Sequence, residues 1–148
     1  MPTPLRFLSP LHKALRQVSL HLDGSTKALG VISSERHLLS YLYSYGPCAI
    51  AEIQRVFGHK RSTLTSILNR LAARGLITRA VHPKDRRSFL IALTGKGRRL
   101  ARELRGHFHR LESRIQALLD KASMAGFHRV LSAIASVTKV EVRGSRND

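Results

Sequence analysis

Two short helices joined by a tight turn constrain the fold of this chain more than any other feature. Apolar residues at helical spacing predict one helix over residues 49–57 and a second over residues 62–74. Gly58 lies between them, where a turn needs a backbone conformation that side chains resist. Gly75 follows the second helix in the position of a C-terminal cap. The pattern predicts a compact pair of crossed helices.

Two predicted strands follow this pair of helices directly. Alternating apolar residues predict strands over residues 77–81 and 88–93. The loop between them, residues 82–87, ends in the sequence Lys-Asp-Arg-Arg. A helix pair followed by a charged hairpin is the order of elements in a winged helix-turn-helix. Residues 46–97 read as one complete unit of this kind.

Longer helices flank this unit on both sides. Ser9 and Pro10 predict the start of an N-terminal helix, and Ser33 is a candidate N-cap for a second helix. Thr94 predicts the N-cap of a long helix whose apolar residues recur up to residue 119, and a last helix covers residues 127–137. These terminal helices are too apolar to stand in water, so they must pack on one another or on a second copy of the chain.

The predicted fold class is therefore mainly α with a small β-wing (α+β). Residues 1–32 and 106–142 are expected to form a helical dimerisation lobe, and residues 33–105 a winged helix-turn-helix lobe for DNA binding. Residues 143–148 are expected to form a disordered tail.

Charge is the strongest signal in the composition. Lys and Arg total 26 against 9 Asp and Glu, which gives a formal net charge of +17. Residues 52–105, which contain the predicted wing, hold fourteen basic and three acidic residues. Such a chain attracts polyanions, of which nucleic acid is the commonest inside cells and an acidic membrane surface is the alternative.

Several classes of protein are disfavoured. The single cysteine, Cys48, excludes a disulfide framework within one chain. No apolar run has the length of a signal peptide near the N-terminus or of a membrane span elsewhere, so a cytoplasmic location is expected. No enzyme is expected either, because no carboxylate pair, nucleophile–base set or metal motif is present.

Residues within the winged unit resemble the MarR family of bacterial transcription regulators. The resemblance rests on Ser-Thr-Leu-Thr at residues 62–65, on Asn-Arg-Leu and Arg-Gly-Leu-Ile-Thr-Arg within residues 69–79, and on Asp-Arg-Arg-Ser at residues 85–88. It implies an α/β winged-helix fold, a homodimer built by the N- and C-terminal helices, and binding to a palindromic DNA operator. It also implies that a small, often aromatic, effector releases the DNA.

The predicted function is thus a sequence-specific DNA-binding transcriptional regulator, a ligand-responsive repressor that acts as a homodimer. The alternative is a non-specific or architectural nucleic-acid-binding protein without an effector. The two differ in whether affinity depends on the base sequence.

The candidate DNA-binding residues lie on the second helix of the pair and at the tip of the wing. The start of such a helix enters the major groove, and an arginine at a hairpin tip suits a narrow minor groove. Asp85 is expected to pair with Arg87 and hold its guanidinium in one pose. Lys60 departs from the family, which commonly has a capping Ser or Thr there, so Ser62 is an alternative cap. The predicted set is Lys60, Arg61, Ser62, Thr63, Thr65, Ser66, Asn69, Arg70, Lys84, Asp85, Arg86 and Arg87.

The sequence gives weaker indications for the other candidate sites. Five cations at the start of the long helix are either phosphate contacts or a solvated face: Lys96, Arg98, Arg99, Arg102 and Arg105. Five polar or aromatic residues on the first two helices are candidates for the effector pocket: His12, Arg16, His37, Tyr41 and Tyr45. Cys48 is expected to be a buried packing residue in a short strand beside the wing. Neither a metal nor a cofactor is predicted, because the eight histidines lack metal-binding spacing.

Overall fold

The computed structural model describes residues 1–139, and the tail predicted at residues 143–148 lies outside that part. The described chain forms six α-helices, one short 3₁₀ helix and a three-stranded antiparallel sheet, which confirms the mainly α class with a small wing. None of these helices combines the length and the apolar character needed to cross a membrane. The elements are α1 (Leu8–Ser25), η1 (Lys27–Leu29), α2 (Ser33–Tyr45), β1 (Cys48–Ala49), α3 (Ile50–Phe57), α4 (Arg61–Ala73), β2 (Ile77–His82), β3 (Asp85–Leu93), α5 (Gly95–Gln116) and α6 (Lys121–Thr138).

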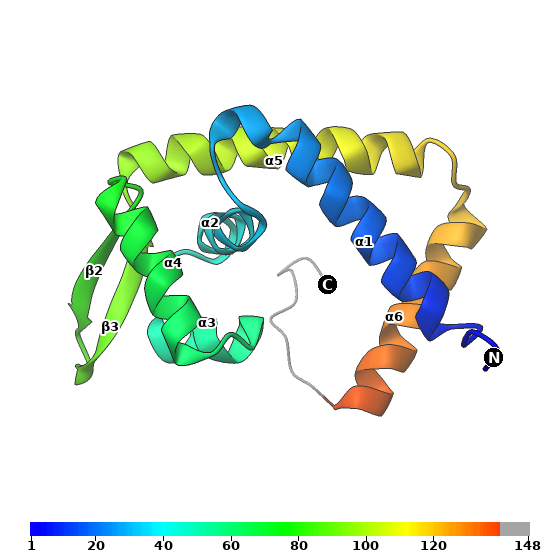
Figure 1. Cartoon of the computed structure of the whole chain (residues 1–148), viewed down its shortest axis with the longest axis horizontal. Helices are drawn as coiled ribbons and strands as arrows, with labels where there is room; N and C mark the ends of the chain where they lie inside the picture. Colours follow the sequence, from blue (N-terminus) through cyan, green and yellow to red (C-terminus); the bar gives the residue numbers. More distant parts are fainter. Residues whose placement is uncertain (140–148) are drawn as a thin grey trace.

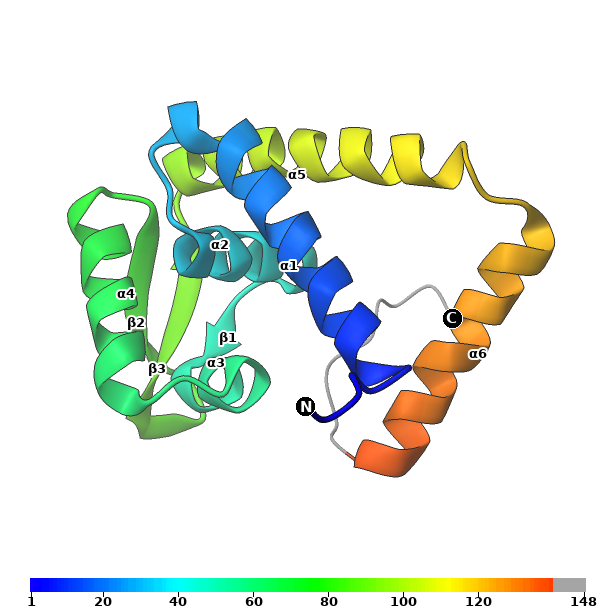
Figure 2. The ribbon, with the colours of Figure 1, turned by 45° about the vertical axis from the view of Figure 1, so that its right-hand side comes forward.

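The long helix α5 connects two groups of elements (Figure 1). Its first half lies over α2, α4 and the hairpin of β2 and β3, and its second half runs toward α6. The C-terminal end of α1 lies beside the middle of α5, and its N-terminal end points toward α6 (Figures 1 and 2). The chain therefore places the helix pair and wing at one end, and α1 with α6 at the other.

One hydrophobic core holds the first group together. Leu39 of α2, Ile53 of α3, Leu71 of α4, Ile91 of β3 and Leu104 of α5 are all completely inaccessible to solvent. These residues come from five different elements, so burying them fixes the orientation of α4 relative to the wing.

The sheet has the strand order β1-β3-β2. Cys48 pairs with Ile91 and is 1% exposed, which confirms that it packs in a short strand beside the wing. The hairpin is longer than predicted, because β3 begins at Asp85 instead of residue 88. Asp85, Arg86 and Arg87 therefore belong to a strand, and only Pro83 and Lys84 form the turn.

The helix starts were predicted with mixed success. Thr94 does cap α5, since its Oγ1 accepts a hydrogen bond from the Gly97 N–H at 3.0 Å. Ser9 does not cap α1, which begins at Leu8 and carries Pro10 within its first turn, where a missing N–H costs nothing. Ser33 is the first residue of α2 and not its cap.

Candidate nucleic-acid interface

Helix α4 presents a polar outer face. Leu64, Ile67, Leu68 and Leu71 are buried against the core, which leaves the other sides of the helix to solvent. The exposed residues of this face include the predicted set Arg61, Ser62, Thr63, Thr65, Ser66, Asn69 and Arg70.

Helix α4 begins one residue earlier than predicted. Lys60 occupies the N-cap position and its side chain makes no capping hydrogen bond. Ser62 is not the cap either, because it already lies inside the helix that starts at Arg61. The Thr65 hydroxyl donates to the Arg61 carbonyl oxygen at 2.9 Å, so this side chain is partly turned back on its own helix. The first N–H groups of α4 remain available to an anion.

Two residues in the second half of α4 are held by other elements. Arg70 Nε donates to Glu35 Oε1 at 2.9 Å, which ties α4 to the start of α2. Arg79 of β2 donates from Nη2 to Asn69 Oδ1 at 2.7 Å, which ties α4 to the wing. Both Asn69 and Arg70 stay exposed on their outer sides.

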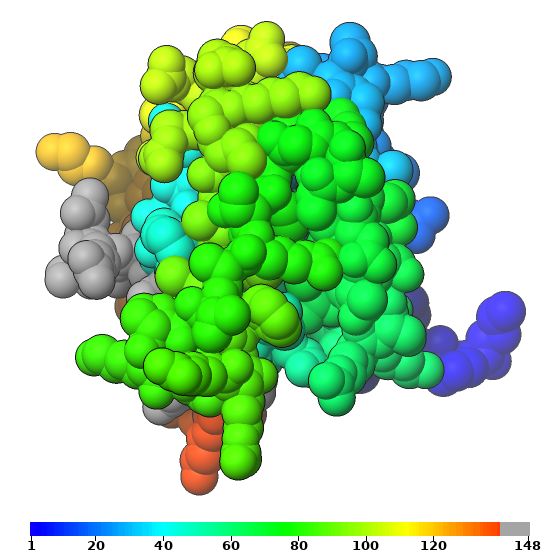
Figure 3. All heavy atoms as spheres, turned by 90° about the vertical axis from the view of Figure 1, so that its left-hand side faces the viewer, coloured from blue at the N-terminus to red at the C-terminus, as the bar shows by residue number. Residues whose placement is uncertain are grey.

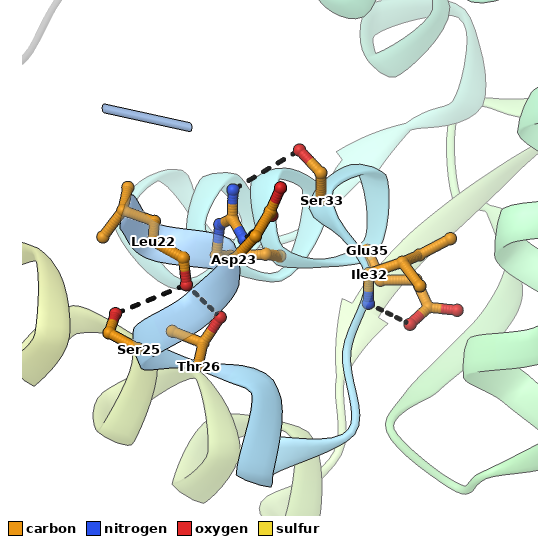
Figure 4. Close-up of polar contacts among 8 residues, drawn as sticks. Leu22, Asp23, Ser25, Thr26, Ile32, Ser33 and Glu35 are labelled. Atoms are coloured by element: carbon orange, nitrogen blue, oxygen red, sulfur yellow. Dashed lines mark hydrogen bonds and ion pairs between the residues drawn. The ribbon is translucent and has the colours of Figure 1, made fainter. Parts of the chain in front are cut away.

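Glu35 is the centre of a small polar network. Its side chain is 5% exposed. Besides Arg70, it accepts a hydrogen bond from the Ile32 N–H at 3.2 Å and lies 3.5 Å from Arg74 Nη1 (Figure 4 shows Ile32 and Glu35). Arg74 also donates to the Gly30 carbonyl oxygen at 2.9 Å. A buried carboxylate is stable only when its oxygens are paired in this way.

Arg36, the next residue of α2, bonds to α1 instead of α4. The Arg36 side chain is fully buried, donating from Nη1 to Asp23 Oδ1 of α1 at 2.6 Å and from Nη2 to Ser33 Oγ at 3.4 Å. Figure 4 shows Asp23 and Ser33 converging at this junction of α1 and α2. The two charged residues at the start of α2 therefore hold different helices.

The wing carries its cations on a short hairpin, and one predicted contact in it is wrong. Asp85 Oδ1 accepts a hydrogen bond from the backbone N–H of Arg87 at 3.0 Å, whereas the expected pair was with the Arg87 guanidinium. The aspartate thus shapes the backbone of the strand start, as Asp side chains do in tight turns. Lys84, Arg86 and Arg87 all remain exposed.

The wing, α4 and the start of α5 share one face of the molecule (Figure 3). Arg98, Arg99, Arg102 and Arg105 of α5 are exposed. Lys96 has a local partner, because its Nζ donates to the Arg74 carbonyl oxygen at the end of α4 at 3.0 Å. This bond satisfies a helix terminus, which is a structural role for one of the five cations.

The five effector candidates lie on α1 and α2 and differ in exposure. His12 and Arg16 are exposed on α1, and His37 is exposed on α2. Partial desolvation and then the charge of Arg36 lower the pKa of His37. Tyr41 is buried, and its hydroxyl donates to Glu52 Oε1 at 2.9 Å.

The two tyrosines belong to an aromatic cluster between α2 and α3. The Tyr41 ring lies 4.6 Å from the Tyr45 ring and 5.4 Å from the Phe57 ring, centroid to centroid. Such contacts fasten α2 to the helix that precedes α4. Their role as effector ligands stays a prediction.

Sequence reasoning missed Glu35, Arg74 and Arg79. A Glu at the third position of α2 is a local signal for N-terminal capping, which Glu35 does provide. Glu35 pairs with Arg70, 35 positions away, and with Arg74, and Arg79 bonds to Asn69, ten positions away, so no helical spacing indicated these contacts.

A helix pair on a common core, a two-stranded hairpin after it and a short strand that completes the sheet define a winged helix-turn-helix protein. A sequence model of the MarR family matches residues 29–88. YkoM, an HTH-type transcriptional regulator of Bacillus subtilis strain 168, is 27% identical over 128 residues, which cover 78% of this chain and 83% of YkoM. Residues 29–88 are therefore similar to the MarR family of winged-helix regulators.

Solved structures share the fold over nearly the whole chain. MepR of S. aureus, in a complex with DNA, superposes with a TM-score of 0.79 and 19% identity, covering 91% of this chain and 99% of MepR. NadR in complex with 4-hydroxyphenylacetate superposes with a TM-score of 0.79 and 21% identity, covering 91% of this chain and 98% of NadR. The likeness therefore includes α1, α5 and α6 as well as the winged unit.

Proposed function

We infer that the chain is a sequence-specific regulator that binds a palindromic DNA operator as a homodimer. The observation that carries this proposal is the shared face of α4 and the wing (Figure 3), on which the polar and basic side chains of both elements are exposed. MepR, which has a similar fold and was solved in a complex with DNA, supports DNA as the partner.

Each part of the face has its own task. Arg61, Ser62, Thr63 and Ser66 enter the major groove with the start of α4 and read base edges. Lys60 and Thr65 flank that contact, while Asn69 and Arg70 lie further along the helix. The wing follows the neighbouring minor groove, into which Arg86 or Arg87 extends, and Lys84 meets phosphate beside it. Asp85 contributes by shaping the strand that carries the two arginines.

Dimerisation uses the apolar surfaces at the far end of the molecule. An open groove of about 600 Å³ between α1, α5 and α6 is lined almost entirely by apolar side chains. Large apolar residues around it are exposed, among them Leu15, Val18, Ile115, Phe127 and Leu131. Single chains rarely leave so much contiguous apolar surface in water, and helices of a second copy would cover it. In this proposal residues 1–32 and 106–139 belong to the dimerisation lobe, and the last three residues of the predicted range 106–142 lie outside the described part of the chain.

The regulator is further proposed to be a repressor that responds to a small aromatic effector. NadR, which has a similar fold, binds 4-hydroxyphenylacetate. In this chain the candidate contacts are His12, Arg16, His37, Tyr41 and Tyr45, which lie on the two helices that join the dimerisation end to the winged unit. A thermal-shift screen of small aromatic acids tests this part by itself, and the absence of any stabilising acid refutes it.

A non-specific nucleic-acid binder is the second candidate, and the net charge of +17 favours it. Such a protein would bind duplexes of any sequence with a steep dependence on salt. Competition between a duplex selected from a randomised pool and a scrambled duplex of the same length separates the two proposals. A selected sequence that gains no advantage identifies the non-specific binder.

The wing provides the direct test of the proposed function. Arg87→Ala should weaken binding to the selected duplex by about tenfold or more, since it removes a charged contact worth about 1.5–3 kcal/mol. Arg110→Ala is the matched control, because it removes an exposed arginine from α5, away from the wing. Fluorescence anisotropy at fixed salt measures both variants. Equal affinities for Arg87→Ala, Arg110→Ala and the unmodified chain would contradict the wing assignment.

A further inference from the structure

The second half of α4 differs chemically from its first half. At the start of the helix, Ser62, Thr63 and Ser66 carry hydroxyl groups that can both donate and accept hydrogen bonds. At Asn69 and Arg70, part of each side chain is already bonded within the chain, because Asn69 Oδ1 accepts from Arg79 and the Arg70 Nε–H donates to Glu35. This difference limits what the second half of the helix can recognise.

Arg79 fixes the orientation of the Asn69 amide. A guanidinium has no acceptor, so the atom of Asn69 that faces Arg79 Nη2 at 2.7 Å must be the carbonyl oxygen Oδ1. The amide nitrogen therefore points away from Arg79. An asparagine that reads adenine must point its oxygen and its nitrogen at the same base, and here the bond to Arg79 restricts where the oxygen can point.

Arg70 is held in a similar way by Glu35. The Nε–H of Arg70 donates to Glu35 Oε1, and the side chain of Arg70 remains 47% exposed. Because Glu35 is almost completely buried and is also bonded to the Ile32 N–H, it is a rigid anchor. The outward part of the guanidinium then offers its terminal N–H groups as a pair of donors.

The position along the helix favours phosphate as the acceptor. Asn69 and Arg70 follow Arg61 by eight and nine residues, which corresponds to ~12–14 Å along the helix axis. The N-terminal residues of a recognition helix are the ones that reach base edges. Residues this far along lie at the level of the sugar–phosphate backbone, which presents only acceptors to them.

We propose that Glu35 and Arg79 are positioning residues that make the second half of α4 a phosphate-binding segment, through Arg70 and Asn69. Base recognition is then confined to the first half of the helix. This inference rests on the proposed DNA-binding function and adds to it a division of labour within α4, set by two residues that need not touch the DNA themselves.

The first experiment compares affinity with base preference. Asn69→Ala and Arg70→Ala should each weaken binding to a selected duplex and to a scrambled duplex by the same factor, about tenfold for Arg70→Ala. Arg70→Ala should also reduce the slope of log affinity against log salt by about one. Ser62→Ala is the contrast, since it should lower the preference for the selected duplex. A tenfold change in base preference with Asn69→Ala or Arg70→Ala would overturn the inference.

The second experiment asks whether the positioning residues act through their partners. Glu35→Gln should weaken DNA binding in the unmodified chain and have no further effect in the Arg70→Ala background. Glu103→Gln on α5 is the matched control for the change of charge. Arg79→Ala, which alters an exposed side chain and leaves the core intact, should likewise have no further effect in the Asn69→Ala background.

The outcomes separate the two levels of the proposal. Additive effects in both double variants would show that Glu35 and Arg79 act by another route, and would overturn this inference while leaving DNA binding intact. If the unmodified chain binds no duplex at all, the proposed function fails first. Circular dichroism melting of each variant excludes loss of folding as the cause, and the Arg79 pair decides the matter if Glu35→Gln does not fold.

Discussion

Gly97 is the position where one added methyl group tests how closely α5 packs on the base of the wing. Gly97 is buried in the first turn of α5. A Cβ atom built there would overlap the carbonyl oxygen of Leu76 and lie 2.9 Å from its carbonyl carbon. The same oxygen accepts a hydrogen bond from the Thr94 N–H at 3.0 Å. The neighbour is backbone, so the clash cannot be relieved by a rotamer change.

The expected cost of Gly97→Ala follows from three contributions. Alanine gains about 1 kcal/mol of helix propensity over glycine. Forcing the backbone of Leu76 away costs about 3 kcal/mol, the upper part of the range for overpacked cores. Disturbing the hydrogen bond from Thr94 adds about 1 kcal/mol. We therefore expect the free energy of unfolding to fall by about 3 kcal/mol, or the Tm by roughly 6–12 °C for a chain of this size.

Urea unfolding followed by circular dichroism, at one protein concentration for all variants, measures this loss. Gly106→Ala is the matched control on the same helix, because a Cβ there meets only the flexible end of Arg110, at 3.5 Å. The control should gain about 0.5–1 kcal/mol. If Gly97→Ala is as stable as Gly106→Ala, the close approach of α5 to Leu76 is not a feature of the folded protein.

Three further predictions concern the cap, a histidine and the cysteine. Thr94→Ala removes both the acceptor for the Gly97 N–H and a 2.6 Å hydrogen bond to the Gly75 carbonyl oxygen. It should lower the free energy of unfolding in urea by about 1–2 kcal/mol, whereas Thr94→Ser should keep most of that stability. The pKa of His37 is lowered from 6.5, so the unfolded chain takes up the proton first, and stability should fall as pH drops below 6.5 toward the folded pKa. His37→Asn should lessen that loss in pH-dependent melting, and an unchanged pH profile would contradict the lowered pKa. Cys48 is 1% exposed, so a thiol reagent should label it far more slowly in the native protein than in urea; equal rates would refute its burial.

The features that the sequence predicted correctly are those set by local rules. Thr94 could be assigned as a cap because a capping residue needs only the next three residues of its own helix. The strands of the wing and the burial of Cys48 followed from alternation and apolar surroundings. The turns at Gly58 and Gly75 have positive φ angles of 63° and 68°, as a glycine-based turn requires.

The features that the sequence could not predict depend on contacts between distant segments. Asp85 has two candidate donors on Arg87, the guanidinium and the backbone N–H, and only the hairpin geometry selects the second. The link from Glu35 to Arg70 spans 35 residues and requires the fold of the core. Helices α1 and α2 begin at Leu8 and Ser33, so neither Ser9 nor Ser33 stands at an N-cap, and Glu35 accepts the hydrogen bond from the Ile32 N–H.

The adjacent residues Glu35 and Arg36 also determine where the molecule can bend. The Arg36 side chain is fully buried, so separating it from Asp23 would leave a buried charge without its ionic partner, which is unfavourable. The end of α1, the start of α2 and the second half of α4 are therefore expected to move as a single rigid body. If the winged unit rotates relative to α6 and the start of α1, we expect the helices to bend outside this rigid body. The expected places are α1 before Asp23 and α5 beyond Leu104, the last buried residue of that helix. These two stretches of helix are the hinges to examine by hydrogen exchange.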